Sequence, residues 1–314
     1  MFNSKVALGT WSWGSGRNGG DQIFGNHLKQ ADLQAVVDTA MAAGLNLWDT
    51  AAAYGQGSSE TLLGNCLQKY NRSDYFLSTK FTPVFASDGE DAVDQMLSES
   101  LKRLHTDYVD LYWIHNSDDV EKWTPKMIPL VKQGLVKHIG VSNHNLAQIK
   151  RAKEILNEGG VELSAVQNHY SLLYPQSQET GILDYCHQNN ITFFPYMVLE
   201  QGALSGKYNV DHPFAGDSQR ARTYNPMLKE LTALTDKMSE IADKYSVAVA
   251  DIATAWVIQK GTTPIIGVTK KEYIADTKRA TDLKLTQDEM TSLEDLAAKT
   301  HVNTRGHWEA NMNK

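Results

Sequence analysis

The chain has 314 residues, 41% of them hydrophobic and 21% charged, a composition typical of globular proteins and unlike that of disordered or fibrous sequences. Its formal net charge of −7 argues against nucleic acid as the main partner, because such binding depends on neutralising phosphates. No apolar stretch reaches the roughly 18 residues of a membrane span, and no basic segment followed by an apolar run marks a secretory signal. We therefore expect a cytoplasmic protein with no membrane partner, whose cysteines, Cys66 and Cys186, are reduced and buried.

Eight short apolar segments recur along the chain, with starts about 30 residues apart except for one longer gap. We predict strands at residues 6–9, 45–48, 75–78, 109–114, 138–141, 165–167, 192–196 and 264–266. The segments between them carry helical spacing, as in the stripe Leu33, Val36, Val37, Ala40 and Met41. Two further stripes run through Leu97 and Ile149. Gly44 and Gly134 are expected to end helices, and Asn143 or Asn145 to begin one.

Strands that alternate with helices predict a parallel sheet, because each strand needs a crossover helix to return. Eight even units favour an α/β fold of one closed (β/α)8 TIM barrel over residues 1–314, with a doubly wound open sheet as the alternative. The long gap, at about 197–263, predicts an extended loop and an extra helix, at about 227–245, between strands seven and eight. Loops that follow barrel strands lie at the face where ligands bind.

Two possible motifs are set aside. Residues 14–19 match the glycine pattern of a dinucleotide-binding turn, but Gly20-Asp21-Gln22 follow and no helix is expected to begin there. We interpret this stretch as a flexible loop. The histidines show neither an HxH nor an HExxH pattern, so no metal site is predicted.

Polar residues stand at the ends of successive predicted strands, where a barrel would bring them to one mouth. They are Asp49 and Tyr54 after the second strand, Lys80 after the third, His115 after the fourth, Ser142 and Asn143 after the fifth, Gln167 after the sixth and Tyr196 after the seventh. Each alone has an ordinary explanation, since a single Lys is usually solvated and a single Tyr or His usually structural. Together they favour a site.

The first four of these residues suit proton transfer to a carbonyl oxygen. A free tyrosine has a pKa of about 10, and an ammonium beside it favours the phenolate and lowers that pKa. We expect Lys80 to act in this way on Tyr54, with Asp49 holding Lys80 and His115 orienting the carbonyl. None of these groups is a hydride source, so carbonyl reduction would require a nicotinamide cofactor.

The ordered motifs resemble those of the aldo-keto reductases over nearly the whole chain. They are LGTW at 8–11, GLNLWDTA at 44–51 with Tyr54-Gly55 and Ser59-Glu60, STK at 78–80, DLY at 110–112 with His115, IGVSN at 139–143, Val166-Gln167 with Tyr170, GKY at 206–208, and PIIG at 264–267. The resemblance implies a catalytic tetrad of Asp49, Tyr54, Lys80 and His115, with Tyr54 as general acid. It also implies that Ser142, Asn143 and Gln167 hold a nicotinamide carboxamide on which Tyr196 stacks.

The resemblance implies further cofactor contacts along the mouth, from Thr10, Trp11, Asp49, Lys207, Arg220, Gly267, Thr269, Lys270, Tyr273 and Asp276. Some positions depart from the family pattern: Met197-Val198 replace Ser-Pro, Asp276-Thr277 replace Glu-Asn, and Tyr273 replaces an arginine. The basic residues, with Arg222 and Lys271, favour NADPH over NADH by binding the 2′-phosphate. The alternative is an ordinary solvated surface.

The expected substrate contacts are Trp11, Trp13, Tyr54, His115, Asn116 and Trp308, with Trp113 and Trp123 as further wall residues. Trp308 belongs to a tail that could fold over the mouth or pack elsewhere. The leading hypothesis is an NADPH-dependent oxidoreductase that interconverts carbonyls and alcohols. The alternative is a cofactor-binding regulatory subunit resembling potassium-channel β subunits, and a barrel lyase, isomerase or hydrolase is disfavoured. The physiological substrate and the oligomeric state stay open.

Overall fold

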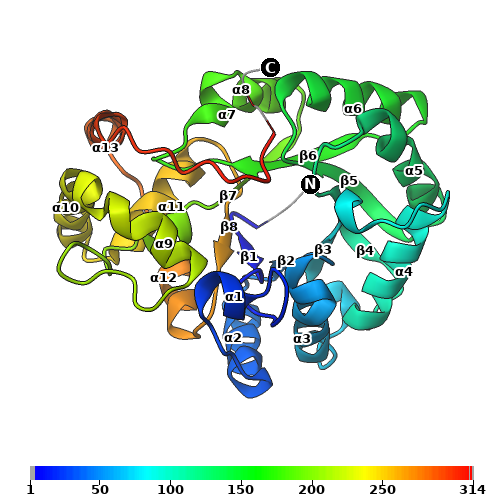
Figure 1. The fold of residues 1–314 in the computed structure, drawn as a ribbon, viewed down its shortest axis with the longest axis horizontal. Helices are drawn as coiled ribbons and strands as arrows, with labels where there is room; N and C mark the ends of the chain where they lie inside the picture. The colour runs from blue at the N-terminus through cyan, green and yellow to red at the C-terminus, as the bar shows by residue number, and fades with distance from the viewer. Residues whose placement is uncertain (1–3, 311, 313–314) are drawn as a thin grey trace.

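The computed structural model describes residues 4–310 and 312, and its centre is one ring of parallel strands (Figure 1). The strands are β1 (Ala7–Gly9), β2 (Leu47–Asp49), β3 (Phe76–Phe81), β4 (Val109–Ile114), β5 (Val136–Ser142), β6 (Leu163–His169), β7 (Thr192–Tyr196) and β8 (Ile265–Gly267). Their order is β7-β6-β5-β4-β3-β2-β1-β8, and every pair is parallel. Thr263 N donates to Phe193 O at 2.9 Å across the remaining gap. The predicted (β/α)8 barrel is therefore confirmed against the open sheet.

Helices connect the strands and surround the ring (Figure 1). They are α1 (Gly20–Phe24), α2 (Gln30–Ala42), α3 (Ser58–Leu67), α4 (Ala92–Leu104), α5 (Val120–Lys132), α6 (Leu146–Glu158), α7 (Gln176–Glu179), α8 (Ile182–Gln188), α9 (Gln219–Tyr224), α10 (Leu228–Tyr245), α11 (Val249–Gln259), α12 (Glu272–Ala280) and α13 (Gln287–Lys299). Short 3₁₀ turns are η1 (Tyr54–Gly57), η2 (Arg72–Asp74), η3 (Pro83–Phe85), η4 (Glu200–Gly202) and η5 (Asn225–Met227). Among the described residues, no helix combines the length and apolar character needed to cross a membrane.

The strand period of two residues separates the core into an inner and an outer layer. The inner cluster fills the barrel with Ala7, Leu47, Leu111, Trp113, Ala165 and Phe194. Alternate residues such as Trp48 and Tyr112 join the larger cluster beneath the helices. The alternation that points every second strand residue into the barrel, here called the inward parity, continues to the ends of the strands. It brings Asp49 in step with Leu47 and Tyr196 in step with Phe194, so the polar strand ends meet at one mouth.

Several helix ends follow the sequence signals. Gly44 and Gly134 adopt positive φ of 73° and 76° after α2 and α5, a conformation that glycine reaches without steric cost. Asn145 begins α6 with a capping box, since its side chain accepts from Gln148 N at 3.0 Å and Gln148 Oε1 accepts from Asn145 N at 2.9 Å. Of the two asparagines considered, Asn145 is thus the cap.

The strands β3 and β6 run past their predicted ends at residues 78 and 167. Lys80 pairs in register with Trp113, and His169 with Tyr196. Polar residues interrupt the apolar run there while the backbone ladder continues, because these side chains enter the barrel mouth and not an apolar layer. Lys80 and His169 therefore lie within strands, on rigid backbone.

Residues 14–19 do not lead into an open loop as expected, because α1 begins directly after them at Gly20. Gly20 packs so closely on the preceding turn that a Cβ atom would lie 2.0 Å from Ser12 O. The Asp21 carboxylate accepts from Gly16 N at 3.0 Å and so occupies the start of this helix. A dinucleotide-binding turn is not formed.

The long gap between β7 and β8 contains the predicted loop and the predicted helix, which is α10. It also contains α9 and α11, which the sequence pattern did not predict. Residues 251–257 of α11 are all buried. Because α11 is mainly apolar and is buried around most of its circumference, its amphipathic period is weak, and this explains why α11 was missed.

Candidate active site

The centre of the mouth is a buried ion pair between neighbouring strands β2 and β3. Lys80 Nζ lies 2.5 Å from Asp49 Oδ2, 2.7 Å from Thr50 O and 3.2 Å from Tyr54 Oη. The Lys80 side chain is 0% exposed and that of Asp49 4% exposed. Lys80 therefore uses its three hydrogen-bond positions on one carboxylate, one carbonyl and the hydroxyl of Tyr54.

The second oxygen of Asp49 is held by three other strands. Asp49 Oδ1 accepts from Ser78 Oγ at 2.6 Å, from Trp113 Nε1 at 3.1 Å and from Gln167 Nε2 at 3.4 Å. A buried carboxylate is tolerated when its charge is paired and its lone pairs are filled. These contacts fix Asp49, and through it Lys80, in one position.

Tyr54 stands in η1, the turn directly after β2, and aromatic rings surround it. Its ring stacks on Trp11 with centroids 6.0 Å apart and meets His115 edge to face at 5.8 Å. His115 follows β4, and its Nδ1 lies 3.0 Å from Thr82 Oγ1. The structure thus brings together all four residues of the expected tetrad.

The charge states differ in one respect from the expectation. Burial raises the pKa of Tyr54, and Lys80 opposes this without outweighing it, so the pKa lies above its usual value and not below it. Burial lowers the pKa of Lys80, but Asp49 and Tyr54 more than offset this and raise it. Burial, with the nearby Lys80 charge, holds the pKa of His115 well below its usual value. At neutral pH the group is a neutral phenol, an ammonium and a neutral imidazole.

The expected carboxamide-binding residues lie beside this centre. Ser142 and Asn143 follow one another at the end of β5, and both are buried. Asn143 Nδ2 donates to His115 O at 2.8 Å and to Ser142 Oγ at 3.2 Å. Tyr196 Oη donates to Asn143 Oδ1 at 2.6 Å. Ser142, Asn143, Gln167 and Tyr196 therefore form a connected rim of amide and hydroxyl groups next to an aromatic face.

The C-terminal tail crosses the mouth, and in Figure 1 the red segment after α13 runs across β7 toward β6. Trp308 meets Trp11 edge to face with centroids 5.8 Å apart. Trp308 Nε1 donates to Tyr196 Oη at 3.2 Å, and Trp308 O accepts from Asn116 Nδ2 at 3.2 Å. Trp11, Asn116 and Trp308 thus lie together over the mouth.

Other tryptophans expected in the substrate wall lie in the core. Trp13 is 2% exposed, packs near Trp48 and donates its Nε1 to Val268 O at 2.6 Å. Trp113 fills the barrel interior, where it holds Asp49, and Trp123 of α5 packs on Phe81 of β3. These positions do not support the predicted substrate contact of Trp13 or the wall positions of Trp113 and Trp123: Trp13 faces the core beside Trp48, Trp113 points into the barrel interior from β4, and Trp123 belongs to α5.

The residues expected at the phosphate end lie on two segments, the loop after β7 and the turn into α12. Lys207 Nζ donates to Tyr273 Oη at 2.8 Å and so joins the two segments. Gly267 is exposed, and a Cβ atom there would meet no atom within 4 Å. Lys270 is exposed, as are Lys271 and Arg222, and Thr269 is partly buried.

Two of the residues expected at the phosphate end, Arg220 and Asp276, already contact other side chains of the protein. Arg220 lies over the rings of Phe214 and Tyr208, at 5.3 and 5.8 Å, and its Nε is buried without a hydrogen-bond partner among the described residues. Asp276 pairs with Arg279 on α12. Thr10 is fully buried and its Oγ1 accepts from Ser59 Oγ at 2.9 Å, so it supports the turn after β1 from below.

Sequence reasoning missed a buried charged group next to Tyr196, made of His169, Glu200 and Glu309. His169 ends β6 and continues the inward parity of Ala165 and Gln167. That parity was the available signal, and ending the sixth strand at residue 167 concealed it. Glu309 lies in the tail, where no periodic pattern marks a contact.

The comparisons with known proteins agree with the geometry of the site. Residues 5–298 match the aldo/keto reductase family. The chain is 30% identical to a chloroplastic pyridoxal reductase of Arabidopsis thaliana, over 93% of this chain and 82% of that protein. The fold of a glycerol dehydrogenase from Gluconobacter oxydans superposes with a TM-score of 0.80 at 25% identity, covering 96% of this chain and 93% of that one. An aldo-keto reductase from Klebsiella pneumoniae, solved with NADPH, gives 0.74 at 23% identity over 93% and 90% of the two chains. The chain is a member of the aldo/keto reductase family.

Proposed function

We propose that this protein is a cytoplasmic NADPH-dependent oxidoreductase that reduces an aldehyde or ketone to an alcohol, reversibly, with Tyr54 as the general acid. The observation that carries the proposal is the arrangement of Tyr54 Oη, 3.2 Å from Lys80 Nζ, with Lys80 paired to Asp49 at 2.5 Å. Burial keeps the phenol of Tyr54 protonated, and the fixed ammonium of Lys80 stabilises the phenolate that forms as the proton leaves. Tyr54 is therefore suited to donate a proton.

The residues present fit a nicotinamide dinucleotide. At one end, the Ser142 hydroxyl and the amides of Asn143 and Gln167 offer both donors and acceptors to a carboxamide, beside the flat ring of Tyr196. At the other end, Lys270 and Lys207 supply exposed cations, and Gly267 leaves open space at the end of β8. The buried Nε of Arg220, which has no hydrogen-bond partner within the described part of the chain, is a further donor on this side of the mouth. The related enzyme from Klebsiella pneumoniae holds NADPH, which supports the choice of cofactor.

When bound, a nicotinamide supplies or accepts a hydride. The protein residues then manage the proton and the charge. His115 is neutral and can hydrogen-bond the carbonyl oxygen without repelling Lys80. Tyr54 donates its phenolic proton to that oxygen as negative charge grows there. Lys80, kept protonated by Asp49, stabilises the phenolate that remains. In the oxidation of an alcohol the same proton returns to Tyr54.

The aromatic residues at the mouth keep water away from the reacting groups. Trp11 stacks on Tyr54 and Trp308 closes on Trp11, so the proton donor lies under an aromatic cover. An electrostatic interaction between Lys80 and a developing phenolate is stronger when water is kept out. The aromatic cover suits carbonyl compounds with a flat or apolar part next to the reacting group.

The test is the loss of NADPH absorbance with a panel of carbonyl compounds, including an aromatic aldehyde, a keto-sugar, pyridoxal and dihydroxyacetone. We expect turnover with at least one of them, and none in the matched variant Tyr54→Phe, which keeps the ring and loses the proton. Equal turnover by the two proteins would overturn the assignment of Tyr54. NADPH binding without turnover on any member of the panel would contradict the proposed reaction.

A further inference from the structure

A buried charged bridge connects three segments of the chain beside Tyr196. His169, at the end of β6, is 0% exposed. Its Nε2 lies 2.8 Å from Glu200 Oε1, in η4 after β7, and its Nδ1 lies 2.8 Å from Glu309 Oε1, in the tail after α13. One imidazole ring therefore joins a barrel strand, the loop of the neighbouring strand and the C-terminal tail.

The two carboxylates are held from further elements. Glu200 accepts from Tyr224 Oη of α9 at 2.7 Å, from Ser171 Oγ, and from Thr304 Oγ1 of the tail at 3.2 Å. Glu309 Oε1 also accepts from Gly306 N at 2.8 Å. Both ends of the tail segment 304–309 are thus tied to this bridge.

Titratable and charged groups also face His169 from the other elements packed around it. The rings of Tyr174 and Tyr196 stack on its two sides, with centroids 4.2 and 5.6 Å away. Arg305 is the nearby cation of the tail, and its Nη2 donates to Glu309 O at 3.0 Å. Within the described residues, the two carboxylates contact the ring directly, and Tyr224 lies behind Glu200. Anionic groups therefore dominate the surroundings of the ring.

The geometry matches that of a charged histidine between two carboxylates. A neutral imidazole has one N–H and one acceptor nitrogen, and it could donate to only one of two carboxylates. Here both ring nitrogens lie at hydrogen-bond distance from carboxylate oxygens, so both donate in the imidazolium form. Burial lowers the pKa of His169, but Glu200 and Glu309 outweigh this and raise it to about 9. Loss of the proton would leave buried carboxylates without their cation, which is strongly unfavourable.

The bridge is connected to the mouth through Trp308, the residue before Glu309. Trp308 Nε1 donates to Tyr196 Oη at 3.2 Å, and the Tyr196 ring rests on His169. Fixing Glu309 therefore fixes the indole that covers Tyr54 through Trp11. We propose that His169 and Glu309 are positioning residues, a buried ion pair that holds the C-terminal tail closed over the mouth at neutral pH and releases it in alkaline solution.

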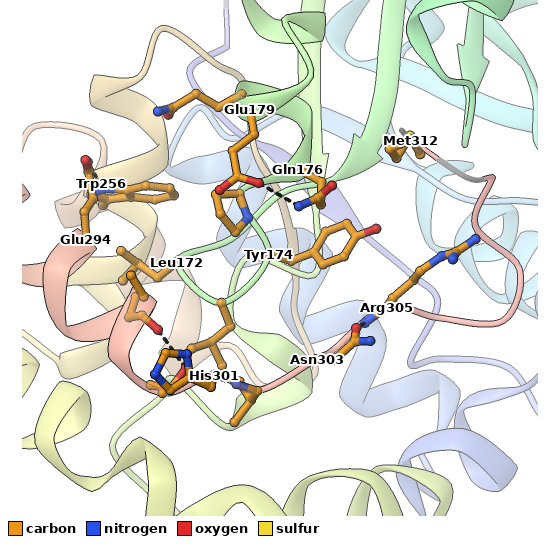
Figure 2. A pocket seen from close by; sticks show the side chains of 17 residues that line it. Leu172, Tyr174, Gln176, Glu179, Trp256, Glu294, His301, Asn303, Arg305 and Met312 are labelled. Atoms are coloured by element: carbon orange, nitrogen blue, oxygen red, sulfur yellow. Dashed lines mark hydrogen bonds between the residues drawn. The ribbon is translucent and has the colours of Figure 1, made fainter. Parts of the chain in front are cut away.

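A cavity on the outer side of the tail leaves room for that release. It has a volume of about 620 Å³ and is bounded by the tail, by the segment after β6 and by α11 and α13. Figure 2 shows Tyr174 and Arg305 on one side of it, opposite Trp256 and Glu294. Tyr174 thus separates the bridge from this space. A tail that leaves His169 can move outward without displacing the barrel.

Trypsin cleavage after Arg305 measures tail opening directly. The next amide, Gly306 N, is bound to Glu309 Oε1, so this peptide bond becomes available to a protease only when the tail leaves the bridge. The variant Glu309→Gln keeps an oxygen for Gly306 N and removes the charge that pairs with His169. We expect cleavage after Arg305 to be roughly 5- to 10-fold faster, the range for replacing a charge-assisted hydrogen bond by a neutral one.

The matched control is Glu179→Gln, the same change at a carboxylate that borders the same cavity but hydrogen-bonds Gln176. It should be cleaved after Arg305 at the wild-type rate. A cleavage rate in Glu309→Gln equal to that of the wild-type protein would overturn the proposal. If Glu309→Gln unfolds globally, cleavage appears at many sites together, and the pH dependence of the wild-type protein decides.

The sign of that pH dependence follows from the raised pKa. A histidine whose folded pKa of about 9 exceeds its usual 6.5 stabilises the closed tail fully at low pH, and this stabilisation is lost as the pH rises through about 9. Cleavage of the wild-type protein, normalised to an unstructured arginine peptide in the same buffer, should therefore rise from about pH 6.5 and level off above about pH 9. Glu309→Gln should lack this rise. A flat normalised rate in the wild-type protein would refute the bridge.

The kinetic consequence, unlike the cleavage assay, rests on the proposed function. Glu309→Gln should raise the KM of a bulky carbonyl substrate more than it lowers kcat, because Trp308 loses its place while the tetrad stays intact. If no carbonyl is reduced at all, the proposed reaction fails while the cleavage result still stands. Faster cleavage of Glu309→Gln with an unchanged KM would confine the bridge to holding the tail and overturn its positioning role.

Discussion

Tyr54 Oη and Lys80 Nζ lie 3.2 Å apart at the mouth of the barrel, and burial affects the pKa of Tyr54 more than this contact does. Lys80 favours the phenolate, yet the pKa of Tyr54 still lies above its usual value because the ring is desolvated and Asp49 neutralises much of the lysine charge. Tyr54 therefore keeps its proton at neutral pH, and Lys80 stabilises the phenolate once a substrate oxygen accepts that proton. This is the state that a general acid needs.

The variant Tyr54→Phe should lose carbonyl reduction by about 10²–10⁴-fold or more, since a positioned general acid contributes about that factor. The ring contacts with Trp11 and His115 remain, so NADPH binding should hardly change. Stopped-flow turnover and fluorescence titration of NADPH measure the two quantities separately. Wild-type kcat on a good substrate would show that Tyr54 does not donate the proton.

The variant Lys80→Met should also lower kcat, and its pH profile gives the sharper test. Reduction requires protonated Tyr54, so activity falls as the pH rises through the Tyr54 pKa. Lys80 lowers that pKa, and its removal should move the alkaline limb to higher pH. An alkaline limb that stays in place would mean that another group limits the reaction.

Lys80→Met also leaves Asp49 buried without its cation, which can destabilise the fold by itself. The double variant Asp49→Asn/Lys80→Met removes both charges and provides the control. It should recover thermal stability without recovering kcat. Recovery of both would assign Lys80 a role in folding and not in catalysis.

The sequence was most informative where strand parity and chemistry agree. Asp49 and Lys80 could be placed together because parallel strands end at one mouth and each interrupts an apolar run. The balance between burial and charge at Tyr54 could not be predicted, since it depends on how deeply the ring is covered. Trp13 was misplaced because an aromatic residue carries no sign of which layer it joins. Glu309 was missed because its contact with His169 spans 140 residues between a tail and a strand.

The variant Lys270→Ala should raise the KM for NADPH more than the KM for NADH. Lys270 is exposed in the turn into α12, and a charge-assisted hydrogen bond to a phosphate contributes about 1.5–3 kcal/mol. Arg220→Ala tests the other segment, but its guanidinium packs on Phe214 and Tyr208, so this change also removes packing. Steady-state kinetics with both cofactors separate these effects. An equal loss with NADPH and NADH would contradict the 2′-phosphate assignment.

The last prediction concerns Tyr196 and Trp308, for which the sequence favoured separate roles in cofactor and substrate binding. The hydrogen bond from Trp308 Nε1 to Tyr196 Oη, 3.2 Å long, makes them neighbours, so their effects should be partly coupled. Tyr196→Ala should weaken NADPH binding with every substrate, because a stacked aromatic contributes about 0.5–1.5 kcal/mol beyond its buried area. Trp308→Ala should change KM by different factors for dissimilar carbonyls. The variants Tyr196→Phe and Trp308→Phe each remove this hydrogen bond together with contacts of their own, to Asn143 and Trp11 respectively, and a double-mutant cycle on the cofactor Kd isolates the shared bond with an expected coupling of about 0.5–1.5 kcal/mol. Additive effects would show that the tail does not reach Tyr196 in solution, and equal KM changes for all substrates would place Trp308 outside the substrate pocket.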